Sequence, residues 1–163
     1  MHAEAQDFIR RASGMIDPPD RVIEFGAQDV NGTPRWAWPD AEWLGVDIER
    51  GPGVNVVADI TSLVPSAWLN LFDLGICTEV LEHVKDAHKG FDNLLACVKP
   101  GGHVLVTVAT TGRAPHACNG GPVGSEWYRN IEPWELVRDD LEPVLQEVHP
   151  ERGDLYLLAT KCG

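Results

Sequence analysis

The stretch Arg21-Val-Ile-Glu-Phe-Gly-Ala-Gln-Asp-Val-Asn-Gly32 decides how this chain is expected to fold. Residues 22–25 are typical of a buried strand, which runs directly into Gly26 and a polar turn. Such a turn presents backbone N–H groups beyond the carboxyl end of a strand, where open α/β sheets bind nucleotide-like ligands. An ordinary strand with a polar turn has the same pattern, so the rest of the chain must decide between these readings.

Length and charge narrow the classes of protein. With 163 residues, the chain is expected to form a single domain over residues 1–163. The formal net charge is −12, because 13 basic residues stand against 25 acidic ones. Nucleic-acid binding depends on lysines and arginines that neutralise phosphates. We therefore expect a small-molecule partner rather than a nucleic acid.

The cysteines and the apolar segments indicate the cellular compartment in which the protein is expected. Its four cysteines are widely spaced and form no Cys-x-x-Cys pair, which favours free thiols in a reducing compartment. The amino-terminal residues lack the basic and apolar blocks of a signal peptide. No apolar run reaches the roughly 18 residues that cross a membrane. We expect a cytoplasmic protein with no membrane partner.

Expected strands alternate with expected helices along most of the chain. Strands are predicted at residues 21–25, 43–48, 54–60, 72–77, 103–108, 141–148 and 154–162, and helices at 3–16, 65–71, 86–98 and 132–140. This alternation is typical of a parallel α/β sheet, and the last two strands are expected to pair in antiparallel. Prolines 34 and 39 leave room for only a short helical turn after the first strand, beside tryptophans expected to cover the sheet.

Two further segments are predicted to be irregular. Lys99-Pro-Gly-Gly102 is a strong turn signal before the fifth strand. Residues 109–131 form the longest stretch without a periodic pattern, and loops of this length in compact domains are often functional.

Acidic or polar residues lie at the carboxyl ends of three of the predicted strands. Asp47 precedes Ile48 at the end of the second strand, Asp59 precedes Ile60 at the end of the third, and Thr78-Glu79 follows the fourth. Carboxyl ends of parallel strands meet at one edge of the sheet, so these residues should lie together. An acid about 20 residues after a glycine turn suits hydrogen bonds to ribose hydroxyls. An adenosine-containing cofactor fits this pattern.

The glycine turn distinguishes between such cofactors. A nicotinamide cofactor carries a pyrophosphate, for which the Gly-x-Gly-x-x-Gly pattern is typical, and positions 28 and 31 here are Gln and Asn. The Gly-Lys-Ser/Thr of a phosphate-binding loop is also missing from the sequence. A nucleoside with an uncharged linker therefore fits better than NAD, and an oxidoreductase is the weakest alternative.

Five segments between residues 20 and 110 carry a combined signal. They are Val22-Ile-Glu-Phe-Gly26, Gly45-Val-Asp-Ile48, Ala58-Asp-Ile60, Phe72-Asp-Leu-Gly-Ile-Cys-Thr-Glu-Val-Leu-Glu-His83 and Leu95-Ala-Cys-Val-Lys-Pro-Gly-Gly102. With these segments in this order and spacing, the chain resembles the class I S-adenosylmethionine-dependent methyltransferases. The resemblance implies a Rossmann-like, doubly wound, mostly parallel seven-stranded sheet with an antiparallel last strand. It also implies S-adenosyl-L-methionine as cofactor and S-adenosyl-L-homocysteine as product.

The resemblance also implies roles for individual residues. Gly26, Ala27 and Gln28 would pass beneath the methionine part of the cofactor. Asp47 would hold the ribose hydroxyls, and Asp59 would accept a hydrogen bond from the adenine amino group. The full cofactor-binding set it implies is Glu24, Gly26, Ala27, Gln28, Asn31, Asp47, Ile48, Ala58, Asp59, Ile60, Thr78 and Glu79.

The first motif departs from the family pattern. The family commonly has E/D-x-G-x-G-x-G, whereas Gln28 and Val30 stand at the second and third glycine positions here. Bulkier residues leave less room for a close approach of the backbone. Either side chains of Gln28 or Asn31 replace those contacts, or the affinity for the cofactor is reduced.

Methyl transfer from a sulfonium depends mainly on positioning, with one base to take a proton from the acceptor. The candidates for catalysis are Glu79, His83 and His116, with Tyr128 beside them. Glu79 and His83 are four residues apart and would share a face if this segment were helical. His83 fits a surface histidine equally well. His116 and Cys118 offer only two metal ligands, so no metal site is expected.

We therefore expect a methyltransferase that acts on an oxygen or nitrogen of a small molecule or saccharide, with the oligomeric state left open. The alternative is a non-catalytic methyltransferase-like module that binds the cofactor or a partner protein. The altered glycine turn favours this alternative.

Overall fold

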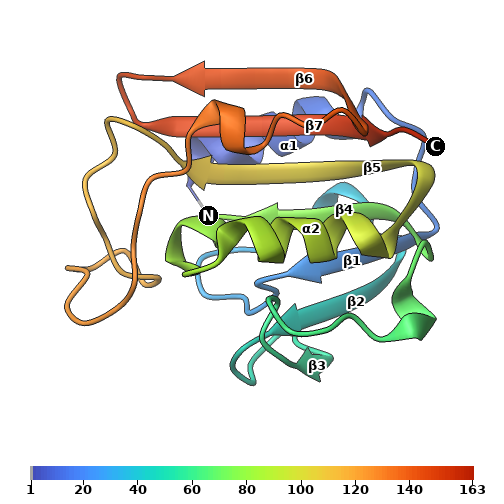
Figure 1. Cartoon of the computed structure of the whole chain (residues 1–163), viewed down its shortest axis with the longest axis horizontal. Coiled ribbons are helices and arrows are strands. Elements are labelled where there is room, and N and C mark those ends of the chain that lie inside the picture. Colours follow the sequence, from blue (N-terminus) through green and yellow to red (C-terminus); the bar gives the residue numbers. More distant parts are fainter. Residues whose placement is uncertain (1) are drawn as a thin grey trace.

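The computed structural model describes residues 2–163, and a seven-stranded sheet forms its centre (Figure 1). Along the sheet the strands follow the order β3-β2-β1-β4-β5-β7-β6. The strands are β1 (Arg21–Phe25), β2 (Glu42–Asp47), β3 (Val56–Val57), β4 (Phe72–Thr78), β5 (Val98–Ala109), β6 (Leu141–His149) and β7 (Asp154–Lys161). The first five strands run parallel, and β7 is antiparallel to both β5 and β6. The predicted fold class is confirmed.

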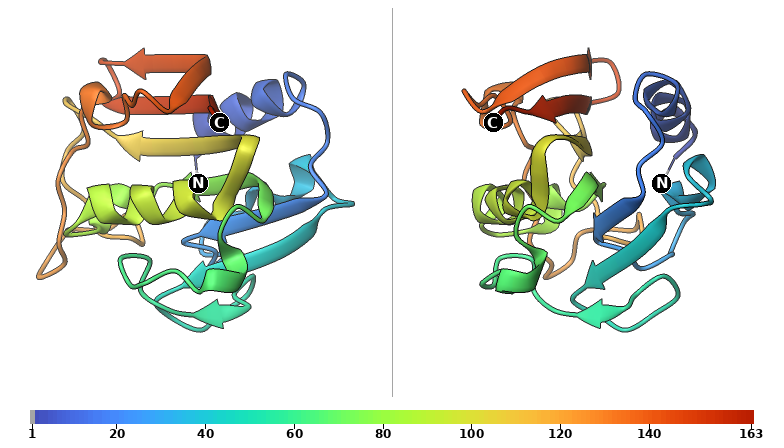
Figure 2. Two further views of the ribbon diagram at one scale, coloured as in Figure 1. Left: turned by 45° about the vertical axis from the view of Figure 1, so that its right-hand side comes forward. Right: turned by 90° about the vertical axis from the view of Figure 1, so that its right-hand side faces the viewer.

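Two α-helices cover the sheet, one on each face (Figure 2). They are α1 (Ala3–Ser13) and α2 (Ala87–Cys97). The remaining helical segments are short 3-10 turns: η1 (Pro34–Ala37), η2 (Ser66–Trp68), η3 (Leu81–His83) and η4 (Pro133–Glu135). Within residues 2–163, neither α-helix is long and apolar enough to cross a membrane.

Each helix buries its apolar side against a separate core. Phe8 and Ile9 of α1 are fully buried in one core with Leu74 of β4. Phe91 of α2 packs in the other core, together with Cys77 of β4. Side chains alternate between the two faces of the sheet along a strand. Leu74 and Cys77, which are three residues apart, therefore point to opposite faces and belong to different cores. The two cores hold the carboxyl ends of the parallel strands at one edge.

Four predicted segments differ from the structure. The strand predicted over 54–60 is reduced to β3, and the helices predicted over 65–71 and 132–140 are reduced to η2 and η4. The turn predicted at Lys99-Pro-Gly-Gly102 lies inside β5, which begins at Val98. The register of β5 against β4 shifts between Phe72 and Leu74, because an irregular strand accommodates the turn as a bulge.

The expected short turn after β1 is present as η1, and an arginine stabilises it. Arg35 donates from Nε to Oε2 of Glu24 at 3.1 Å and from Nη2 to the carbonyl oxygen of Gly53 at 2.6 Å. Its guanidinium also lies 5.2 Å from the ring centre of Trp43. Trp38 is buried as expected of a covering residue, whereas Trp36 is exposed. Arg35 therefore connects η1 to β1 and to the turn after β2, in a region that has only a short helical turn.

The buried Glu24 gives a testable pH dependence. Burial raises its pKa to about 7, against the opposing effect of Arg35. Since the pKa is higher in the folded protein, this group stabilises the fold at low pH and loses that contribution as the pH rises through about 7. For Glu24→Gln we expect a flatter decrease in the free energy of unfolding between about pH 4.5 and 7. Over this pH range, the fall in the free energy of unfolding should be on the order of 3 kcal/mol smaller in the variant than in the wild type. Urea unfolding measures both.

A matched control is available on the neighbouring strand. Glu42 has an exposed side chain, so Glu42→Gln should keep the wild-type pH profile. Parallel profiles for wild type and Glu24→Gln would contradict the assignment.

Candidate functional site

The residues predicted to bind the cofactor lie along the carboxyl edge of four neighbouring strands. These strands are β3, β2, β1 and β4, whose arrowheads point to the left in Figure 1. The turn at Gly26 follows β1, Asp47 ends β2, Asp59 follows β3, and Thr78 ends β4. The parallel topology therefore brings segments from the whole first half of the chain to one edge.

Asp47 is held by backbone groups from two turns. Its Oδ2 accepts from the N–H of Gln28 and its Oδ1 from the N–H of Glu49, each at 3.0 Å. A carboxylate offers about four acceptor positions, so two stay available for hydroxyl groups of a ligand. The next residue, Ile48, has 69% of its surface exposed. A fixed carboxylate beside an exposed aliphatic side chain suits a sugar joined to a flat aromatic base.

Asp59 offers a second acceptor at the same edge. Its Oδ1 accepts from both the backbone N–H and the hydroxyl of Thr61 at 2.8 Å, which leaves Oδ2 for a ligand. The N–H of Ala58 donates to the carbonyl oxygen of Asp47 at 2.8 Å and ties the two strand ends together. The side chain of Ile60 is buried against α2.

The glycine turn is closely packed. Gly26 has a φ of +77°, and a Cβ at this position would lie 2.1 Å from Cγ2 of Val80. The side chain of Gln28 lies against Gly51, where an added Cβ would be 2.7 Å from its Cγ. Asn31 is exposed further along the turn. Val80 and Gln28 thus occupy space beside the glycine turn, and no sequence signal pointed to Val80.

Glu79 stands at the end of β4 in a left-handed conformation, with a φ of +59°. Its Oε1 accepts from the Thr107 hydroxyl at 3.0 Å, and its Oε2 lies 2.8 Å from Nδ1 of His2. Burial alone would raise the pKa of Glu79, but the hydrogen bond from His2, the charge of His2 and the bond from Thr107 together lower it. Glu79 is therefore an ionised carboxylate, and sequence reasoning did not foresee its contact with His2.

Three candidate residues form a ring cluster over this edge. The ring centres of His83 and His116 are 5.2 Å apart, and Tyr128 lies 5.6 Å from His83 and 4.9 Å from His116. His83 belongs to η3, while the other two come from the long segment after β5. Burial, followed by the charge of His116, lowers the pKa of His83, so its imidazole is neutral at physiological pH. A neutral imidazole in this position can accept a proton.

Glu82 is an additional member of this region that the sequence reasoning did not assign. It is 1% exposed, and its Oε1 accepts from the N–H of Ala109 at 3.1 Å. Burial, together with the neighbouring Glu79, raises its pKa to about 8. The sequence around Glu82 does not distinguish it from an exposed acidic residue, so its burial was not predicted.

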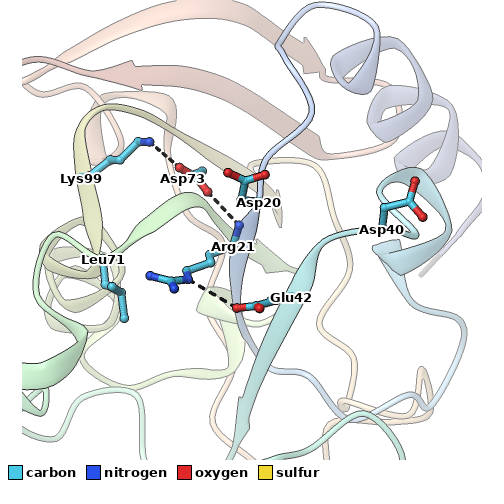
Figure 3. Close-up of a pocket in the computed structure, with 7 residues that line it drawn as sticks. All are labelled: Asp20, Arg21, Asp40, Glu42, Leu71, Asp73 and Lys99. Atoms are coloured by element: carbon cyan, nitrogen blue, oxygen red, sulfur yellow. Dashed lines mark hydrogen bonds and ion pairs between the residues drawn. The ribbon is translucent and has the colours of Figure 1, made fainter.

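A cavity of about 430 Å³ lies at the opposite edge of the sheet (Figure 3). It is lined by Asp20, Arg21, Asp40, Glu42, Leu71, Asp73 and Lys99. Figure 3 shows Asp73 between the Lys99 ammonium and the backbone N–H of Arg21. None of the predicted cofactor residues lines this cavity, and it lies at the amino ends of the strands. The carboxyl edge is therefore the candidate site.

The family of the chain follows from comparison with known proteins. A family model described as a methyltransferase domain matches residues 1–141. The protein belongs to this methyltransferase domain family. The predicted resemblance to the methyltransferases is thereby confirmed.

One curated relative matches only part of the chain. The chain is 33% identical over 86 residues to the ubiquinone biosynthesis O-methyltransferase of Pectobacterium carotovorum subsp. carotovorum (strain PC1). The match includes 53% of this chain and 35% of that enzyme, so it spans well under half of the relative's length.

Solved structures share the fold at low identity. The 1,6-didemethyltoxoflavin-N1-methyltransferase of Burkholderia thailandensis, crystallised with 1,6-didemethyltoxoflavin and S-adenosylhomocysteine, has a TM-score of 0.67 at 17% identity. That match covers 97% of this chain and 80% of the other. The [4+2]-cyclase SpnF has a TM-score of 0.70 at 13% identity, over 96% and 80% of the two chains. The same fold thus occurs in proteins with different named activities.

The packing of the glycine turn can be tested with a matched pair of glycines. Gly26 and Gly101 both have a φ of +77°, but an added Cβ at Gly101 meets no atom within 4 Å. We expect Gly101→Ala to lower the free energy of unfolding by about 1 kcal/mol through backbone strain alone. Gly26→Ala should lower it by about 3 kcal/mol, because its methyl group also overlaps Val80. Urea unfolding measures both.

A further variant separates overlap from strain. Adding Val80→Ala to Gly26→Ala should recover part of the lost stability, since it removes the overlapping methyl groups. Equal losses for the two single glycine variants would refute the close packing at Gly26.

Proposed function

We propose that this chain binds S-adenosylmethionine along the carboxyl edge of β3, β2, β1 and β4 and methylates an oxygen or nitrogen of a small molecule. One observation carries the proposal. The Asp47 carboxylate is fixed by two backbone N–H groups, keeps acceptor positions available, and precedes an exposed Ile48. Among residues 2–163, Asp47 has no ion pair that would compete with a ligand.

The donor and acceptor groups of this edge suit the parts of the cofactor in turn. Asp47 accepts from the ribose hydroxyls, Ile48 packs on the adenine, and Oδ2 of Asp59 accepts from the adenine amino group. Glu79 is ionised and complements the positive charge of the methionine end. The other residues of the proposed site are Glu24, Gly26, Ala27, Gln28, Asn31, Ala58, Ile60 and Thr78. Of these, Glu24 acts through Arg35, which holds the turn after β2.

When bound, S-adenosylmethionine supplies a sulfonium methyl group: the acceptor atom bonds to the methyl carbon while the sulfur–methyl bond breaks and its electron pair stays on sulfur. The acceptor proton then needs a base. The neutral imidazole of His83 is the first candidate, with His116 in ring contact beside it. Glu79 is the other candidate, but its hydrogen bonds to Thr107 and His2 already stabilise its ionised form.

The nature of the acceptor is inferred from charge and from relatives. The net charge of −12 disfavours a nucleic acid. One relative is named for O-methylation in ubiquinone biosynthesis, and one structural neighbour for N-methylation of 1,6-didemethyltoxoflavin. These names support a small-molecule acceptor, with a saccharide as an alternative. The single domain over residues 1–163 and the cytoplasmic location remain predictions.

A second candidate function is cofactor binding without methyl transfer. Val80 packs directly against Gly26, and two glycine positions of the family pattern hold Gln28 and Val30. The [4+2]-cyclase SpnF has the same fold and is named for a different activity, so the fold alone does not imply methyl transfer. Binding of the cofactor with no turnover on any acceptor would favour this second candidate.

Calorimetry with S-adenosylhomocysteine tests the proposed cofactor site. We expect the wild-type protein to bind this product and not NAD. Asp47→Ala should weaken binding about 100-fold, since two hydrogen bonds to a charged acceptor contribute roughly 1.5 kcal/mol each. Asp40→Ala is the control, because Asp40 lines the cavity at the opposite edge. Unchanged affinity in Asp47→Ala would refute the ribose assignment.

Because Asp47 also accepts from two turns, its variant must be shown to fold. Ile48→Asp provides a second test, since this side chain is 69% exposed and its replacement should leave unfolding unaffected. It should still weaken binding at least tenfold by placing a charge against the adenine. No binding of S-adenosylhomocysteine to the folded wild type would overturn the proposed function.

A further inference from the structure

Three possible metal-binding side chains meet beyond the carboxyl edge of β4. Glu82 and His83 belong to η3, and His116 comes from the segment after β5. One ligand atom from each of the three lies within 4.8 Å of the other two. The sequence offered only the pair His116 and Cys118, and the fold now adds a buried carboxylate and a second imidazole.

Two atoms of this cluster are buried and lack any hydrogen-bond partner within residues 2–163. They are Oε2 of Glu82 and Nδ1 of His83. A buried polar atom without a partner costs roughly 1–3 kcal/mol, so native proteins seldom contain one without a reason. Two such atoms in the same three-residue cluster point to a shared partner that is not a protein group. A cation between them would satisfy both lone pairs.

Hydrogen bonds to the backbone hold two of these side chains in place. The Ala109 N–H holds Oε1 of Glu82 at 3.1 Å and leaves Oε2 for another partner. Nδ1 of His116 lies 3.1 Å from the carbonyl oxygen of Ala114. This acceptor keeps the proton on Nδ1 and leaves the Nε2 lone pair available. Hydrogen bonds between ligand groups and the backbone are typical of the surroundings of metal sites.

The ligand types indicate the kind of cation. Two imidazoles with one carboxylate are typical of Zn²⁺ and other first-row divalent metals, whereas Mg²⁺ and Ca²⁺ prefer oxygen ligands alone. Three protein ligands also leave a coordination position open for water or substrate.

A second set, His83, Cys118 and Glu126, shares one histidine with the first. Both Cys118 and Glu126 are exposed, and Glu126 already accepts from the Cys118 N–H at 3.0 Å. The unpartnered carboxylate oxygen belongs only to the first set. The buried set is therefore the better site.

We propose that Glu82, His83 and His116 bind one divalent transition-metal ion of the zinc type. The site adjoins the ring of Tyr128 in the segment after β5. Resting on the proposed function, the open position would take an oxygen of the methyl acceptor, whose hydroxyl pKa the metal would lower. Binding of the ion does not require the cofactor, but with the ion bound His83 would be a ligand and no longer a base, which leaves Glu79 as the candidate base.

Titration of the full chain with ZnCl₂, after treatment with a chelator and without cofactor, tests the site. Calorimetry should show one tight site per wild-type chain. Thermal unfolding should shift upwards with Zn²⁺, because the ion binds the folded state. His116→Ala and Glu82→Gln should each weaken this binding by more than about 100-fold, beyond the loss typical of removing a hydrogen-bond partner of a ligand. They should also remove the thermal shift.

Two control variants exclude general binding to surface groups. His88→Ala removes an exposed histidine outside the cluster, and Cys118→Ser removes a ligand of the second set. Both should bind Zn²⁺ as the wild type does. Loss of binding in Cys118→Ser, or wild-type binding in His116→Ala, would overturn the proposed site.

The two proposals fail separately. Binding of S-adenosylhomocysteine by the chelator-treated protein without a tight Zn²⁺ site would refute the metal proposal and leave the function intact. A tight Zn²⁺ site without binding of S-adenosylhomocysteine would support the metal and refute the function.

Discussion

One carboxylate connects the two turns on which the site depends. Oδ2 of Asp47 accepts from the turn after β1 and Oδ1 from the turn after β2, so both turns are fixed relative to the same strand end. Further bonds continue this link: Asp29 N–H to the Pro52 carbonyl oxygen at 2.9 Å, and Arg35 to the Gly53 carbonyl oxygen. The edge is therefore shaped by backbone hydrogen bonds, although only a 3-10 turn follows β1. A ligand at this edge would meet groups that are already in place, which reduces the ordering cost of binding.

Local patterns predicted the elements whose character is set by their own residues. The strand at 21–25 was predicted with its observed bounds, and so were the antiparallel last strands to within a residue or two. The errors lie where tertiary contacts override local preference. Residues 99–102 carry a turn signal, yet they lie within β5 as an irregular stretch between the pairs Phe72–Val98 and Leu74–His103. At 132–140 the chain forms only η4, because Arg129 binds Glu135 and holds the segment against the preceding loop.

The site was predictable where topology alone brings residues together. Acids at the ends of parallel strands must share an edge, so Asp47 and Asp59 were predicted from sequence. Contacts between distant side chains carry no local signal: Val80 lies against Gly26, and His2 against Glu79. The same holds for the contact among His83, His116 and Tyr128: each was a candidate from the sequence, but only the fold shows that their rings lie together. Glu82 shows the limit most clearly, since only its burial distinguishes it from a surface acid.

The position of the first described residue has a practical consequence. His2 lies 2.8 Å from Glu79 at the carboxyl edge, whereas β7 ends at the other edge, where Nζ of Lys161 donates to the carbonyl oxygen of Val98 at 2.8 Å (Figure 1). Any peptide joined to the amino-terminal side emerges beside the proposed methyl-transfer site. A polyhistidine tag placed there would add imidazoles next to Glu82, His83 and His116 and compete for the same metal. A tag on the carboxyl-terminal side of β7 would avoid this competition.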